Sequence, residues 1–338
     1  MTGLQVAWFV IIAALVAVYA ILDGFDLGIG VLYPILGRTD AQRAMLHGVV
    51  GPVWDGNEVW LIIIGGVLFA AFPAVYATLL SGFYLVFMLV FFGLIFRAMA
   101  LGLHYGGSER SPAWRAALWG GSLVPAFLLG LIAGNLIRGV EVSASGEFAG
   151  SLGSLFGPFA VAVGVLSVAM FANQGVSWAA AKTFGELHAR ATKLRWATGW
   201  MLLVLVALVT LYALWTAGPH GQNMVRRPLG WVAIALTVGG IVGQQVSGWR
   251  GSDRGAFAGA SGAVAGLVGI WAVGMFPAMI PALHDQEMGL TVANASASPG
   301  TLSLMVVIGA VGIPLVGASA LVAYRVFRGR VNEIDEGY

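Results

Sequence analysis

The stretch Val53-Trp54-Asp55-Gly56-Asn57-Glu58-Val59-Trp60 places two carboxylates inside a run that is otherwise apolar enough to lie in a lipid bilayer. A carboxylate near the centre of a bilayer costs about 2.5 to 3.5 kcal/mol on insertion scales, so it normally faces a bundle interior or an ion path. Asp55 and Glu58 are three residues apart, a spacing that points both side chains toward one side of a helix. The stretch therefore predicts a membrane-spanning helix whose carboxylates have a function.

The composition defines the class of protein. Of the 338 residues, 59% are hydrophobic and only 9% are charged, whereas soluble domains carry about 25% charged residues. The 12 Trp and 8 Tyr suit the two membrane interfaces, and the 49 Gly suit close contacts between helices. The sequence has no Cys, which excludes disulfides, thiolate metal sites and c-type haem attachment. We predict an all-α integral membrane protein, surrounded by lipid and without a nucleic-acid partner.

Nine apolar runs have about the 20 residues that a helix needs to cross a bilayer. No basic region precedes the first run and no small-residue cleavage site follows it, so we expect that run to be a retained span. Residues 1–338 are expected to form a single polytopic domain. The expected spans are 5–23, 48–71, 76–103, 117–138, 153–177, 197–217, 229–248, 257–280 and 301–324.

The basic residues predict the orientation, because Lys and Arg accumulate in cytoplasmic loops. With nine spans, thirteen of the 17 Lys and Arg residues fall on one side of the membrane and three on the other, and Arg97 lies inside a span. This distribution places the N-terminus outside and the C-terminus in the cytoplasm. Eight spans would put the basic tail around Arg325 and Arg328 on the same side as the N-terminus, which conflicts with the rule.

Five charged residues in the expected spans or at the inner end of the first one lie in the cytoplasmic half: Asp23, Asp26, Asp55, Glu58 and Arg97. Four carboxylates and one guanidinium are not all charged and dry, so some of the acids must be protonated, hydrated or paired with other groups. A desolvated carboxyl exchanges protons near neutral pH, which a proton-conducting cluster needs. The same residues are equally consistent with a structural ion-pair cluster that holds three helices together.

Several motifs resemble subunit II of cytochrome bd-type quinol oxidases, including the cyanide-insensitive type. The specific ones are Asp23-Gly24-Phe25-Asp26-Leu27-Gly28-Ile29-Gly30 and Gly51-Pro52-Val53-Trp54-Asp55-Gly56-Asn57-Glu58-Val59-Trp60-Leu61. Gly65-Gly66-Val67-Leu68-Phe69-Ala70-Ala71-Phe72-Pro73, Phe96-Arg97, Gly134-Asn135, Gln174-Gly175, Gly185-Glu186-Leu187-His188 and Met275-Phe276-Pro277 follow in the expected order. The resemblance covers essentially the whole chain.

The resemblance implies two four-helix bundles plus one peripheral helix, in a heterodimer within a prokaryotic inner (plasma) membrane. Subunit I of such complexes carries haems b and d and the quinol site, and it reduces dioxygen to water. Subunit II binds no haem and no metal. It completes the complex, which in some members includes small single-span subunits, and contributes a proton path from the cytoplasm. Ubiquinol and menaquinol remain equally open as the electron donor.

The resemblance also implies roles for particular residues. The proton-path aspartate of the family matches Asp55, and its acidic and basic partners match Asp26 and Arg97. Asp23 and Glu58 join the predicted path, although some family members have Gln in place of Glu58. His47, at the cytoplasmic end of the second expected span, is a candidate proton-intake group, because a histidine titrates near neutral pH.

The remaining histidines predict no haem site. His104 and His188 fall in expected inner loops and His220 and His284 in outer ones, with no pair across a bundle core at one depth. We interpret them as surface or interfacial residues. A structural quinone in an apolar cleft is an additional expectation from the resemblance, but no residue spacing identifies its site.

Two alternative functions remain open. A proton-coupled secondary transporter also places ionisable residues beside Gly-rich helices, although the sequence has no clear inverted repeat and an odd number of expected spans. A purely structural assembly subunit would belong to the oxidase without carrying protons.

Overall fold

The computed structural model describes residues 1–102, 111–143, 148–283 and 288–331. Within these ranges the chain is mainly helical, and nine helices are long and apolar enough to cross a membrane. They are α1 (Gly3–Leu36), α3 (Trp54–Ala71), α5 (Tyr84–Gly102), α6 (Pro112–Arg138), α7 (Pro158–Lys182), α8 (Gly185–Thr216), α10 (Pro228–Trp249), α11 (Asp253–Met275) and α12 (Pro299–Val326). The prediction of an all-α membrane protein is confirmed.

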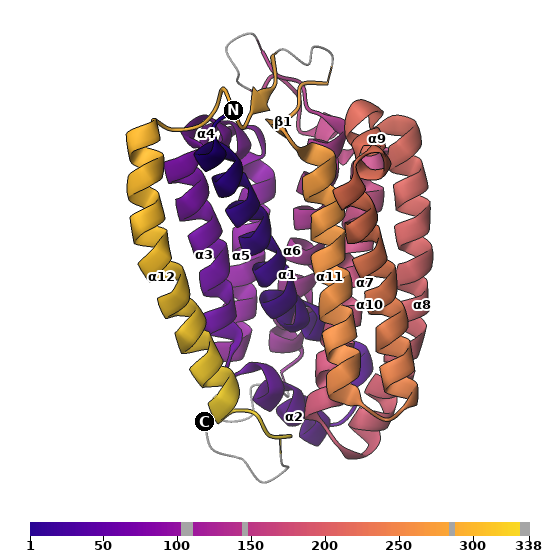
Figure 1. The fold of residues 1–338 in the computed structure, drawn as a ribbon. Helices are drawn as coiled ribbons and strands as arrows, with labels where there is room; N and C mark the ends of the chain where they lie inside the picture. The colour runs from indigo at the N-terminus through magenta and orange to yellow at the C-terminus, as the bar shows by residue number, and fades with distance from the viewer. Residues whose placement is uncertain (103–110, 144–147, 284–287, 332–338) are drawn as a thin grey trace.

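Shorter elements connect the long helices. These are α2 (Asp40–Val50), α4 (Pro73–Gly82), the 3-10 helix η2 (Gly153–Phe156), α9 (Gly218–Arg226), β1 (Ala278–Ile280) and β2 (Leu290–Thr291). The two strands pair antiparallel at the end of the molecule that carries the N-terminus (Figure 1).

The first helix is longer than the expected span 5–23. It continues to Leu36, so Asp23 and Asp26 lie in the interior of a helix rather than at its end. Both side chains are almost fully buried, and each accepts a hydrogen bond from another helix. Because these bonds offset part of the cost of burying the acids, the helix is not forced to end before them.

Three other expected spans are interrupted or displaced. In 48–71, a turn at Gly51, Pro52 and Val53 separates α2 from α3. In 76–103, the helix is interrupted at Phe83, between α4 and α5. Span 257–280 ends early, at Met275, and its last residues form β1.

Proline accounts for much of this difference, because it lacks the N–H that continues a helix. Pro52 lies in the first of these turns and Pro277 directly precedes β1. Pro158 begins α7, whereas the expected span 153–177 started in η2, and α7 continues to Lys182.

The other expected spans differ mainly at their ends. Spans 229–248 and 301–324 agree with α10 and α12 to within a turn. Span 117–138 begins a turn late, because α6 starts at Pro112. Span 197–217 begins three turns late, because α8 already starts at Gly185 and includes the charged stretch that follows.

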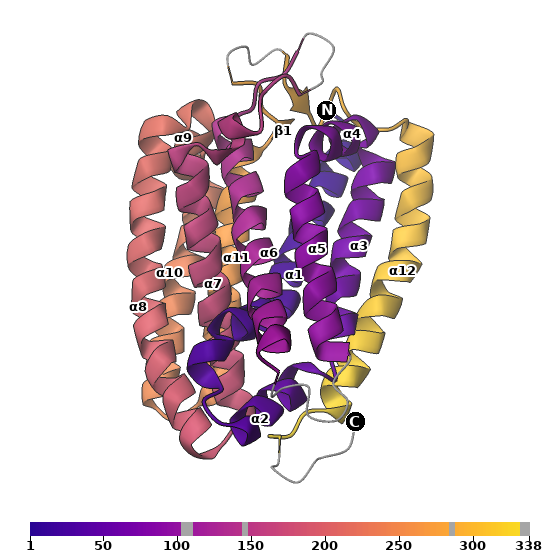
Figure 2. The same ribbon diagram turned by 180° about the vertical axis from the view of Figure 1, so that it is seen from behind.

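The long helices alternate in direction, so α1 begins and α12 ends at opposite ends of the molecule (Figures 1 and 2). Helix α1 is central and packs on α3, α6, α7 and α11. Helix α12 packs along α3 and α1 at one edge, and no residue in its most apolar 18-residue window is buried within the chain. The division into two four-helix bundles plus a peripheral helix remains a prediction.

We call the end that carries α2 and the last turn of α12 the basic end (Figure 2). The α7–α8 and α10–α11 turns also lie there. The described basic residues at this end are Arg38, Arg43, Arg115, Lys182, Arg190, Lys193, Arg195, Arg250, Arg254, Arg325, Arg328 and Arg330. Only Arg138, Arg226 and Arg227 lie at the opposite end among the described residues, and Arg110 lies outside them. The predicted orientation rests on this asymmetry.

Candidate functional site

Close helix crossings position the acidic residues of α1. A Cβ atom added at Gly28 would lie 1.8 Å from the backbone oxygen of Phe171 in α7, and one added at Gly30 would lie 1.9 Å from the Ser122 hydroxyl in α6. Small residues allow backbones to approach in this way within a membrane. The crossings fix the α1 turns that carry Asp23 and Asp26 at the centre of the helix packing.

Arg97 joins three helices. Its guanidinium is fully buried, and Nη2 donates to Asp23 Oδ1 of α1 over 2.6 Å and also to Glu58 Oε1 of α3. Asp23 is fully buried and the Glu58 side chain is 22% exposed. Asp23, Glu58 and Arg97, which the sequence analysis placed at one depth, are therefore in direct contact.

Asp26 is held by an amide rather than by Arg97. Asn57 Nδ2 donates to Asp26 Oδ2 over 2.8 Å and to the backbone oxygen of Leu22 over 3.3 Å. Asn57 is almost fully buried. It lies in the stretch quoted at the outset, yet sequence reasoning gave it no role, although a polar residue inside an expected membrane span is a usable signal.

Asp55 has a different environment. It lies in the first turn of α3 and is exposed on the surface of this chain. Among the described residues, the Arg97 guanidinium pairs with Asp23 and Glu58 and not with Asp55. The shared-side interpretation is thus only partly correct, because Glu58 turns inward to Arg97 and Asp55 does not.

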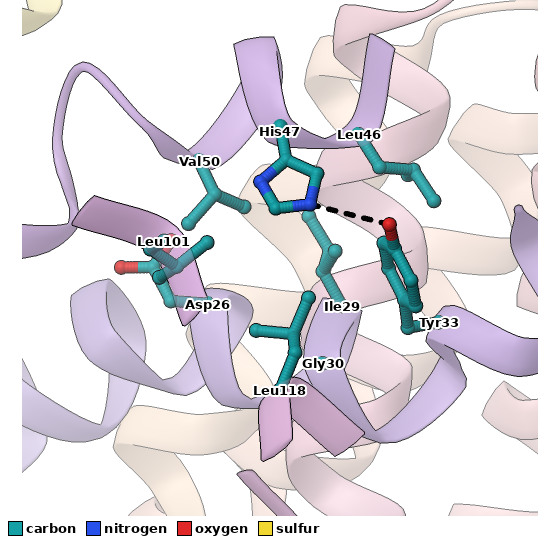
Figure 3. A pocket seen from close by; sticks show the side chains of 9 residues that line it. All are labelled: Asp26, Ile29, Gly30, Tyr33, Leu46, His47, Val50, Leu101 and Leu118. Carbon is teal, nitrogen blue, oxygen red and sulfur yellow. Dashed lines mark hydrogen bonds between the residues drawn. The ribbon is translucent and has the colours of Figure 1, made fainter. Parts of the chain in front are cut away.

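His47 lies beside a small cavity at the basic end. The cavity is lined by residues of α1, α2, α5 and α6, among them Asp26, Tyr33 and His47 (Figure 3). His47 Nε2 lies 3.2 Å from the Tyr33 hydroxyl, at hydrogen-bonding distance. The cavity has about 10 Å³ for the centre of a water-sized sphere, which is room for about one water molecule. It is too small for a quinone ring.

The other described histidines lie outside the acidic site. His188 is partly exposed in the first turns of α8, with Nδ1 2.9 Å from the Ala180 backbone oxygen. His220 is partly exposed in α9, where burial lowers its pKa below 6.5. His104 and His284 lie outside the described residues. Within the described ranges, no three His, Asp or Glu side chains form a metal-binding group.

The charges around Arg97 do not balance if every acid is ionised. Two of the three carboxylates, Asp23 and Glu58, contact the Arg97 guanidinium, which stays cationic at any physiological pH, and the third, Asp26, lies one turn from Asp23 on α1. If all three were ionised, the group would carry excess negative charge in a region of low dielectric constant, which is costly. Protons or water must neutralise part of that charge. The cluster thus has the composition that the predicted proton path requires.

The fold and this cluster define a multi-pass membrane protein with ionisable side chains held between its helices near the basic end. Comparison with known proteins makes the class more specific. Residues 4–327 match the family model described as cytochrome bd terminal oxidase subunit II. The chain belongs to this family and is therefore a subunit of a quinol oxidase complex.

Individual relatives agree over the full length. The chain is 30% identical to cytochrome bd-I ubiquinol oxidase subunit 2 of Escherichia coli K12, covering 98% of this chain and 96% of the relative. It is also 30% identical to cytochrome bd ubiquinol oxidase subunit 2 of Bacillus subtilis 168, covering 98% of each chain. The bd oxidase structure from Geobacillus thermodenitrificans shares the fold, with a TM-score of 0.78 and 19% identity over 96% of this chain and 99% of that one.

Proposed function

We propose that this chain is the non-haem subunit of a membrane complex that oxidises quinol and reduces dioxygen to water. Its partner is a subunit I that carries haems b and d. Family membership supports this assignment, and so do relatives whose names describe subunits of ubiquinol oxidases. The chain completes and stabilises the complex, in a prokaryotic plasma membrane with the N-terminus outside and the C-terminus cytoplasmic.

We further propose that the chain supplies a proton path from the cytoplasm through Asp55. The observation that carries this proposal is the contact of buried Arg97 with Asp23 and Glu58, together with an exposed Asp55 one turn from Glu58 at the basic end. Reducing dioxygen to water consumes protons, so the complex needs an uptake route. Asp55 is open to protons from the cytoplasmic side, and Glu58, one turn further along α3, is the next carboxylate inward.

Arg97 and Asp23 organise this path. Arg97 has a permanent charge and does not relay protons under physiological conditions. By holding Glu58 and Asp23 on one nitrogen, it fixes the position of Glu58 relative to Asp55. A proton arriving at Glu58 reduces the excess negative charge around the guanidinium, which favours its uptake.

His47 provides a second intake. It lies in α2 at the basic end, its ring nitrogen contacts Tyr33, and the same cavity reaches Asp26 (Figure 3). The cavity has room for about one water molecule beside His47 and Tyr33, and Asp26 forms part of its lining. We propose that such a water carries protons onward toward Asp26, by a route separate from Asp55.

The exposed surface of α3 and α5 is apolar, which suits contact with lipid or with another membrane subunit. Their exposed apolar side chains include Ile62, Phe69, Leu85, Leu89, Phe92 and Ile95. Asp55 lies at the basic end of the same helices. An acid beside such a surface is better accommodated by polar groups of another subunit than by lipid. Small single-span subunits and a structural quinone remain expectations to which we assign no residues.

Purification in mild detergent tests the assignment. We expect the chain to co-purify with a larger subunit and to bring the visible bands of reduced haem. A colourless oligomer of this chain alone, active in substrate uptake, would instead support the proton-coupled transporter.

The assembly-only alternative requires a separate test. If the chain only stabilises the complex, acidic-site variants that assemble with normal haem content will consume oxygen at the normal rate. The proposed proton path requires those same variants to be slow.

A further inference from the structure

Tyr324 contacts the acidic site from the far end of the sequence. Its hydroxyl donates to Asn57 Oδ1 over 2.8 Å, across 267 residues of chain. Asn57 in turn donates to Asp26 Oδ2. The last turn of α12 is thereby connected to a carboxylate of α1 through one amide.

The three contacts of Asn57 define the orientation of its amide group. Asp26 Oδ2 and the backbone oxygen of Leu22 are both acceptors, so the NH2 group must face them. The Tyr324 hydroxyl then donates to the opposite oxygen of the amide. Because Asn57 is only 1% exposed, loss of the hydroxyl would leave that oxygen buried without a replacement donor among these groups, which is unfavourable.

The environment of Tyr324 holds the hydroxyl in place. Helix α12 packs loosely along most of its length, but the Tyr324 ring lies edge-on to Phe25 and Trp178, with ring centroids 6.4 and 6.0 Å away. The Lys182 ammonium lies over the Trp178 ring, 4.7 Å from its centroid. These contacts place an otherwise peripheral helix firmly at its basic end.

The chain that follows α12 adds a second anchor. We call residues 327–331 the C-terminal segment. Lys182 Nζ donates to the backbone oxygens of Phe327 and Gly329 over 2.5 and 3.2 Å, and the Val331 amide donates to the Lys182 backbone oxygen. Arg330 pairs with Asp253 at the start of α11 over 3.1 Å. The segment thus ties the end of α12 to α7 and α11.

We propose that Tyr324 is a positioning residue of the proton path: its hydroxyl holds the Asn57 amide with the NH2 group toward Asp26. This inference rests on the proposed function for its effect on oxygen reduction, but not for the contact itself. Without the hydroxyl, the amide regains a donor only by turning its oxygen toward Asp26. That orientation requires a proton on Asp26, because two acceptors otherwise face each other. Tyr324 therefore couples the C-terminal segment to the hydrogen bonding of Asp26.

The test compares Tyr324→Phe, Asn57→Ala and the double variant in the intact complex, by infrared spectroscopy. Tyr324→Phe keeps the ring packing on Trp178 and removes only the hydroxyl. The Asp26 carboxyl or carboxylate band is assigned by its loss in Asp26→Asn. Tyr212→Phe removes a hydroxyl in α8, remote from the site, and is the matched control.

We expect the Asp26 band to shift in Tyr324→Phe and to stay unchanged in Tyr212→Phe. We also expect oxygen consumption to fall roughly threefold or more in Tyr324→Phe, since a hydrogen bond in the chain to a carboxylate is weakened. If Tyr324 acts through Asn57, adding Tyr324→Phe to Asn57→Ala changes neither the band nor the rate further.

An unshifted Asp26 band in Tyr324→Phe would overturn the proposal, and so would fully additive effects in the double variant. If Asn57→Ala does not assemble, the band in Tyr324→Phe alone decides. If Asp26→Asn consumes oxygen at the normal rate, the proton role of Asp26 fails, while the infrared comparison still decides the positioning role.

Discussion

Arg97 and Asp23 form an ion pair over 2.6 Å with neither side chain exposed. A pair of this kind adds little net stability, but removing one partner leaves a buried charge without compensation. Arg97 also donates to Glu58, so one nitrogen connects α5 with both α1 and α3. The ion pair therefore joins helix packing to the proposed proton path, and the two roles respond differently to substitution.

Arg97→Ala is expected to prevent assembly of the complex or to abolish its haem content. The substitution leaves Asp23 and Glu58 without their cation, which costs about 3 to 5 kcal/mol for a buried pair. Complex yield and the visible haem spectrum measure the effect. Arg328→Ala, at an exposed position after α12, is the control and should assemble normally. Normal yield with intact haem in Arg97→Ala would contradict this account of the ion pair.

Glu58→Gln is expected to assemble but to consume oxygen more slowly. The Gln oxygen still accepts from Arg97, and Asp23 still compensates the guanidinium charge, but an amide does not bind and release protons near neutral pH. Haem content and the rate of quinol-driven oxygen consumption test this in one preparation. A normal rate would remove Glu58 from the path and leave it as a ligand of Arg97.

Gly28→Ala is expected to destabilise the protein by disturbing the crossing of α1 and α7. The new Cβ would lie 1.8 Å from the Phe171 backbone oxygen, and overpacking of this kind typically costs about 1 to 3 kcal/mol. Gly239→Ala in α10 is the matched control, because a Cβ there meets nothing within 4 Å. Thermal inactivation of the purified complex should separate the two variants, and equal midpoints would count against the close crossing.

His220 is expected to make the protein less stable as the pH falls below 6.5. Burial lowers the pKa of His220, with Arg227 adding to the effect, while the Gly274 backbone opposes it. The unfolded chain therefore binds a proton at a pH where the folded chain still resists it, and stability declines until the folded histidine is protonated too. The midpoint of thermal inactivation is measured for wild type and His220→Asn at about five pH values between pH 7.5 and pH 5. We expect it to depend less on pH in the variant. An identical pH dependence would rule out this contribution.

Sequence reasoning predicted the class of fold and most of the charged cluster, for identifiable reasons. Charged residues are rare within apolar runs, so Asp23, Glu58 and Arg97 stood out, and helical spacing together with the distribution of basic residues gave them a common depth. Depth restricts which groups can meet. It does not give the rotation of each helix, and for this reason the sequence did not distinguish Glu58, which contacts Arg97, from the exposed Asp55.

The missed contacts depend on distant segments. Nothing within the sequence near Tyr324 indicates that its hydroxyl reaches Asn57, because the contact depends on how α12 packs against α3 and α1. The extension of α1 beyond Asp26 was missed for a related reason. Its acids are acceptable in a helix interior only because Arg97 and Asn57, on other helices, supply donors.

The central claim is that protons consumed in oxygen reduction enter through Asp55, and Asp55→Asn tests it most directly. Asp55 is exposed and lies outside the Arg97 ion pairs, so the variant should assemble with its full haem content. The measurement is the rate of quinol-driven oxygen consumption per haem in purified wild-type and variant complexes. We predict that the variant is assembled but slow, whereas a wild-type rate at normal haem content would contradict the proton path through Asp55.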